Sequence, residues 1–89
     1  MSEVLRANPH VLAAAHGEFT TLLDIDRGHY YSLNETGGMI WDLLSDGSTE
    51  TAILNRLMER FDGAEDVVLA NIKQVIGRLQ AAGLVERVA

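Results

Sequence analysis

Few side chains in this sequence have the type and spacing that catalysis or metal binding requires. Its three histidines are His10, His16 and His29, and none lies four residues from another, as the pair in a helical metal site does. We interpret them as exposed or half-buried structural residues. Asp24 and Asp26 alternate near the end of an expected strand, where two carboxylates could act as acid and base. We interpret this pair as solvated residues that shape a turn.

Motifs for nucleophilic or nucleotide chemistry are also missing. The chain has no cysteine, which excludes thiol nucleophiles, disulfides and zinc sites built on thiolates. It has no G-x-S-x-G motif, P-loop or dinucleotide fingerprint, and Gly37 and Gly38 lie at an expected helix start. Trp41 has aliphatic neighbours at helical spacing and is interpreted as a core residue. The sequence therefore predicts a protein that is not an enzyme and holds no cofactor or metal.

Length and charge limit the partners of the chain. Its 89 residues suit one small domain, and 47% of them are apolar, which is enough for a compact core. The net charge is −6, and the seven basic residues are scattered singly, which argues against binding to nucleic acid or anionic membranes. No signal peptide or apolar run of roughly 18–20 residues occurs. We expect a soluble cytoplasmic protein.

The first part of the chain is expected to form three strands. Residues 10–16 could form a strand or a helical turn, and we interpret them as a strand. Residues 19–25 alternate as a clearer strand, which has Phe19, Thr21, Leu23 and Ile25 on one face. Gly28 ends a tight turn that needs a positive φ. In the strand that follows, Tyr31 and Leu33 are expected to face the helices, and Tyr30 and Ser32 to point away.

Three helices are expected after the strands, at about 35–44, 49–61 and 65–82. Asn34 is the expected N-cap of the first and Ser48 of the second, and Gly83 ends the third. Gly37 and Gly38 each cost roughly 1 kcal/mol in a helix. Their presence predicts close backbone packing under a strand. Residues 84–88 are either a short strand or an extended tail.

The pattern Y-x-L-N-x-T-G-x-x-I-W, which runs from Tyr31 to Trp41, resembles the PqqD-like family. The similarity continues through spaced apolar residues and covers about residues 19–85. It implies an α+β, winged-helix-like fold, in which an N-terminal three-stranded antiparallel sheet precedes three α-helices. It also implies that residues 1–89 form a single domain that recognises ribosomally made precursor peptides before they are modified.

The resemblance further implies how the peptide binds. In such proteins the leader segment of the precursor adds as a strand beside the third strand and lies over the third helix. The chain is most similar to the lasso-peptide recognition proteins, which present the leader to a leader peptidase before a cyclase closes the ring. Asn71 and Val75 stand where the family often has aspartate and a larger aromatic residue, so the groove is expected to differ there.

An exposed edge strand offers unpaired N–H and C=O groups to a peptide strand, and side-chain pockets add specificity. We therefore expect the backbone of the last strand to pair with the leader, and Arg78 to be available for an acidic leader residue. The predicted leader-binding residues of the hairpin are Gly28, His29, Tyr30, Tyr31, Ser32 and Leu33. Those of the third helix are Val67, Val68, Asn71, Ile72, Val75 and Arg78.

Other interpretations remain open. A PqqD-like element could serve a pathway in which a radical enzyme modifies the peptide. The second and third helices could instead form a DNA-binding helix-turn-helix, although the third helix offers only Lys73, Gln74 and Arg78 as readers of bases. A small hydrolase or metal protein lacks support in the residues. The unpaired sheet edge could also join two copies of the chain in a homodimer.

Overall fold

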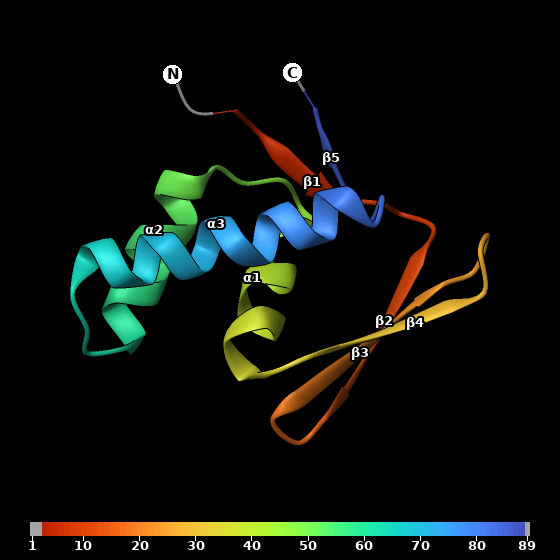
Figure 1. Ribbon diagram of the computed structural model, residues 1–89, viewed down its shortest axis with the longest axis horizontal. Coiled ribbons are helices and arrows are strands. Elements are labelled where there is room, and N and C mark those ends of the chain that lie inside the picture. The colour runs from red at the N-terminus through yellow and green to blue at the C-terminus, as the bar shows by residue number, and fades with distance from the viewer. Residues whose placement is uncertain (1–2, 89) are drawn as a thin grey trace.

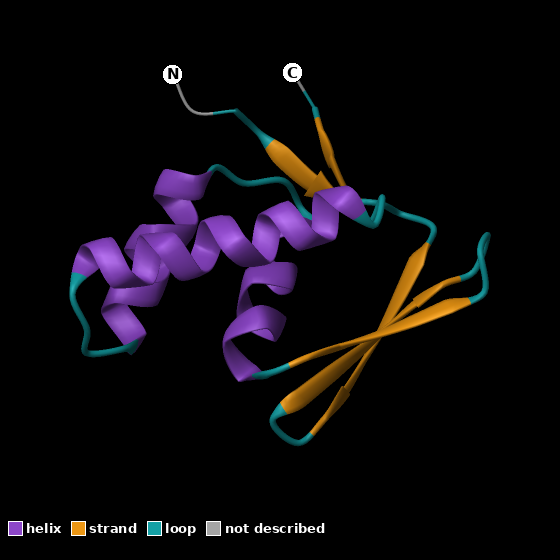
Figure 2. Ribbon diagram, in the orientation of Figure 1, coloured by secondary structure: helices purple, strands orange, loops and turns teal. Residues whose placement is uncertain are grey.

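The computed structural model describes residues 3–88 and has an α+β fold, as the sequence predicts. Its larger sheet is antiparallel and has the order β2 (Val11–His16), β3 (Phe19–Asp24) and β4 (His29–Leu33). Three helices follow, α1 (Glu35–Ser45), α2 (Glu50–Arg60) and α3 (Glu65–Ala81). Figures 1 and 2 show the sheet projecting from one end of the helical layer, so that one face of it is not covered by a helix.

Helix α1 directly follows β4. Helix α1 contacts β3 and β4, and α2 packs against α3 (Figure 1). The core between these elements contains Trp41, which is 4% exposed, as the sequence predicts. None of the helices within residues 3–88 is long and apolar enough to cross a membrane.

A second, two-stranded sheet joins the two ends of the chain. Strand β1 (Leu5–Ala7) pairs antiparallel with β5 (Val85–Arg87). The sequence did not predict β1, and it left β5 open as one of two alternatives. Both strands have only three residues, too few to show a period. They form because Leu5 and Val85 are buried in the common core at 3% and 4% exposure.

Two N-caps set where the first two helices begin. The side chain of Asn34 accepts a hydrogen bond of 2.8 Å from the backbone of Gly37, which confirms the predicted cap of α1. The prediction of Ser48 for α2 is wrong, because the cap is Thr49, whose hydroxyl accepts from Ala52. The backbone of Ser48 is instead held by two hydrogen bonds of 2.8 Å with Leu5.

The close packing predicted for the glycines of α1 is confirmed at Gly38. A Cβ added there would lie 2.7 Å from the Thr20 hydroxyl oxygen on β3. The face of β3 turned to α1 carries Leu22 and Asp24, at 0% and 6% exposure, while Phe19 lies on the opposite face and is 56% exposed. The strand face that looked apolar in the sequence is thus the outer face, because α1 packs against the other one.

Candidate functional site

Strand β4 is an edge strand of the larger sheet. It pairs with β3 alone, in a register that joins His29 to Asp24 and Leu33 to Thr20. Within residues 3–88, no backbone hydrogen bond occupies its other edge. The turn before it contains Gly28, whose φ of 69° confirms the predicted requirement for a positive φ. An edge strand of this kind can accept another strand.

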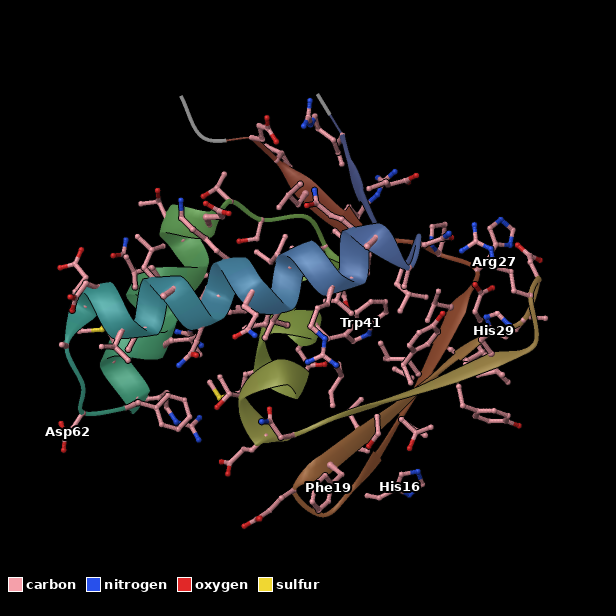
Figure 3. All side chains as sticks on the ribbon, in the orientation of Figure 1. His16, Phe19, Arg27, His29, Trp41 and Asp62 are labelled. Atoms are coloured by element: carbon pink, nitrogen blue, oxygen red, sulfur yellow. The ribbon has the colours of Figure 1, made fainter. Side chains whose placement is uncertain are left out.

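The side chains of β4 divide by face as the sequence predicts. Tyr31 and Leu33 are half-buried and pack against the core, whereas Ser32 is exposed and Tyr30 is 72% exposed. The rings of His29 and Tyr31 meet edge to face, with centroids 6.4 Å apart. Figure 3 shows His29 and Arg27 at one end of the β3–β4 hairpin, and Phe19 at the far end of the sheet.

A cavity of about 450 Å³ lies between β4 and the C-terminal half of α3. Its wall is apolar for the most part and includes residues from β3, β4, α1, α3 and the segment after α3. The lining residues are Phe19, Tyr31, Ser32, Leu33, Asn34, Gly37, Val75, Arg78, Leu79, Ala82 and Leu84. The unpaired edge of β4 therefore borders a concave apolar surface, and we call this space the β4–α3 groove.

The predicted residues of α3 fall into three groups. Val75 and Arg78 line the groove. Val67, which is 58% exposed, half-buried Val68 and exposed Asn71 lie nearer the N-terminal end of the helix and do not line it. Ile72 has no exposed surface, belongs to the core and does not line the groove. Its side chain points inward because it shares the core face of α3 with Ile76 and Leu79, at helical spacing.

Several groove residues were missed in the sequence. Leu79 and Ala82 follow Val75 at intervals of four and three residues, so helical periodicity could have included them. Phe19 and Leu84 have no such signal. They reach the groove because β3 pairs with β4 and because β5 returns beside α3, which are tertiary relationships.

Arg78 is the charged residue of the groove. The described residues that line the groove include no carboxylate, and within residues 3–88 the Arg78 side chain has no ion-pair partner. By contrast, Lys73 on the same helix lies 3.9 Å from the carboxylate of Glu50. The groove thus combines apolar walls with one cation that can bind an anionic group.

The turn between β3 and β4 is shaped by Asp24, as predicted, but the expected solvation of this residue is wrong. Asp24 is 6% exposed, and its carboxylate accepts a hydrogen bond of 3.3 Å from the backbone N–H of Arg27. The guanidinium of Arg27 lies 3.8 Å from the same carboxylate and donates a hydrogen bond of 2.6 Å to the Ala82 carbonyl. The Asp24 carboxylate can be buried because the backbone N–H and the guanidinium of Arg27 take the place of water around it.

The chain is similar in structure to two solved proteins. One is TbiB1 in complex with the TbiA(beta) leader peptide, with a TM-score of 0.85 and 23% sequence identity over 94% of this chain and 98% of that chain. The other is lasso peptide synthetase B1 complexed with the leader peptide, with a TM-score of 0.80 and 23% identity over 92% and 96% of the two chains. At this level of identity the likeness shows a shared fold.

Sequence comparisons identify the family. No curated protein sequence matches the chain. Residues 20–85, which include β4, α1 and all of α3, match the PqqD family, described as coenzyme PQQ synthesis protein D. The resemblance seen in the sequence is thereby confirmed, and the chain belongs to the PqqD family.

Proposed function

We propose that this protein binds the leader segment of a ribosomally made precursor peptide, which adds as a strand to β4 and lies over α3. The observation that carries the proposal is the unpaired edge of β4 beside the β4–α3 groove. Main-chain hydrogen bonds to such an edge supply affinity, and side-chain pockets beside it supply specificity. The two structural neighbours are complexes with leader peptides, which supports the same ligand class here.

The proposed contacts follow from the geometry of the groove. Backbone groups from Gly28 to Leu33 pair with the leader, and Val75 contacts its apolar side chains. Val67, Val68 and Asn71 extend the surface along α3 for a longer peptide. Ile72 supports the wall from the core without touching the peptide. Arg78 binds an acidic leader residue, because it has no ion-pair partner within residues 3–88.

The proposed role is presentation of a substrate and not catalysis. The bound leader would be offered to a leader peptidase and a cyclase of the same pathway, and lasso-peptide biosynthesis is the pathway we favour. One structural neighbour is a lasso peptide synthetase B1, which supports this choice. The groove also suits this role chemically, because among the residues that the structure describes its one charged lining residue is Arg78, which has no ion-pair partner there.

A chemical-shift titration tests the binding face. The neighbouring open reading frames are first searched for a short precursor peptide. The ¹⁵N-labelled protein is then titrated with the synthetic leader of that precursor, and a scrambled leader serves as the control. We expect the largest shifts at the amides of residues 28–33 and at Val75 and Arg78. Changes confined to Leu69 and Lys73, on the other side of the core face of α3, would show that the peptide does not use the groove.

A further inference from the structure

The tip of the β3–β4 hairpin is fastened to the end of α3 by one side chain. Arg27 lies in the turn two residues before β4, and Ala82 directly follows α3. The Nη1 of Arg27 donates a hydrogen bond of 2.6 Å to the Ala82 carbonyl, across 55 positions of sequence. Carbonyls at a helix C-terminus have no intrahelical donor and favour a nearby cation. The bond therefore joins one end of each wall of the groove.

The guanidinium of Arg27 lies between two groups that determine its position. On one side the carboxylate of Asp24, which is 6% exposed, lies 3.8 Å from Nη1. On the other side is Gly83, where an added Cβ would lie only 2.6 Å from the same nitrogen. Gly83 thus has two uses, because its φ of 75° suits the end of a helix and its missing side chain leaves room for Arg27.

In the described part of the chain, no other polar contact joins the two walls directly. Within residues 3–88, no hydrogen bond or ion pair joins β4 to α3. Strand β4 contacts β3 and α1, helix α3 contacts α2 and β5, and apolar side chains of both walls pack against the same core. The apolar contacts to this core hold both walls, and within residues 3–88 the Arg27–Ala82 hydrogen bond is the polar contact that links the β3–β4 turn to the end of α3.

We propose that Arg27 is a positioning residue of the β4–α3 groove, which holds the groove at the width of one peptide strand before the peptide arrives. This inference rests on the proposed function. When a site is already held in its binding conformation, less free energy is lost in ordering it on binding. Its apparent affinity rises with the fraction of molecules in that conformation. Loss of the bond should therefore slow association and leave the rate of dissociation nearly unchanged.

The first arm of the test needs no peptide. The chain has no native cysteine, so spin labels can be placed on cysteines introduced by Tyr30→Cys on β4 and Gln74→Cys on α3. Double electron–electron resonance then reports the distance between the walls. We expect one narrow distribution in the parent protein, a broader one with Arg27→Gln, and a narrow one again with Arg27→Lys, because a single ammonium N–H can reach a single carbonyl.

The second arm measures association and dissociation of the fluorescein-labelled leader by stopped flow, without the spin labels. Arg27→Gln should slow association about fivefold or more if most molecules leave the binding conformation. Arg27→Lys should restore the rate to within about twofold, as retention of one donor implies. Arg87→Gln removes an ion pair of 3.0 Å with Glu3, which lies outside the groove, and serves as the control with unchanged rates.

The outcomes separate this inference from the proposed function. If the parent protein does not bind the leader, the proposed function fails, whatever the distance distributions show. If the parent protein binds and Arg27→Gln leaves both the distribution and the association rate unchanged, Arg27 does not position the groove. A faster dissociation without slower association, or no rescue by lysine, would equally overturn the inference, because either result indicates a different role for Arg27.

Discussion

Gly38 on α1 and Thr20 on β3 are so close that no side chain fits between them. A Cβ at Gly38 would meet the Thr20 hydroxyl oxygen at 2.7 Å. This contact seats α1 directly beneath the sheet and determines where the chain leaves β4, since Leu33 pairs with Thr20 and α1 begins two residues later. The position of the groove therefore depends on the absence of a side chain at Gly38.

Gly38→Ala should lower the free energy of unfolding by about 1 kcal/mol, because the cost of overpacking, about 1–3 kcal/mol, exceeds the gain in helix propensity of about 1 kcal/mol. Gly77→Ala is the matched control, since a Cβ at Gly77 on α3 meets nothing within 4 Å. That variant should be more stable than the parent. Urea denaturation measures both, and a Gly38→Ala protein as stable as the parent would show that α1 can move away from β3.

Val75→Asp should weaken leader binding about tenfold or more, because a carboxylate would be desolvated against an apolar part of the peptide. The fold should survive, since Val75 is only half-buried and lines the groove. Calorimetric titration measures the affinity, and circular dichroism measures the thermal unfolding midpoint. Gln74→Asp, at an exposed position outside the groove, is the control. Equal leader affinities for the two variants would show that Val75 does not contact the leader.

Arg78→Glu should weaken leader binding about tenfold and reduce its dependence on salt, because an attractive charge pair becomes a repulsive one. Arg60→Glu is a suitable control. Arg60 also has no ion-pair partner within residues 3–88, but it lies at the end of α2 and does not line the groove. Affinities are compared at low and high salt. If both reversals weaken binding equally, the effect comes from net charge and not from a contact with Arg78.

Thr49→Ala should lower the free energy of unfolding by about 1 kcal/mol through loss of the N-cap of α2. Ser48→Ala should cost clearly less, because the backbone and not the hydroxyl of Ser48 is held by Leu5. Chemical denaturation of the two variants distinguishes these roles. A larger loss of stability for Ser48→Ala than for Thr49→Ala would show that Ser48 is the N-cap of α2, as the sequence predicts.

Local patterns in the sequence predict much of this fold. Alternation indicates β4 and its two faces, and helical periodicity together with the Asn34 cap indicates α1. The short β1 and the choice of Thr49 over Ser48 could not be predicted, since both depend on Leu5. This residue pairs with Arg87 in β5 and with Ser48 before α2. Pairings between residues so far apart in the sequence produce no local pattern from which they could be predicted.

Some features of the candidate site could likewise be predicted from the sequence, and others depend on tertiary contacts. Alternation predicts the strand, and helical spacing places Val75 and Arg78 on one flank of α3. The use of this strand and helix for binding came from the family resemblance, and the structure brings both residues to one groove. Ile72 could not be separated from its neighbours, because a broad apolar arc on α3 does not show which part the core covers. The contact of Arg27 with Ala82 could not be predicted at all, since it joins a turn to a helix end 55 positions away.

Strand addition at β4 is tested most directly by amide hydrogen exchange, measured residue by residue by NMR with and without the leader. The amides of residues 28–33 that do not bond to β3 should become protected when the leader binds, in an alternating pattern along the strand. The free edge of β2, on the other side of the sheet, should exchange as before. Bound leader with no new protection at β4, or with protection at β2 instead, would contradict strand addition at this edge.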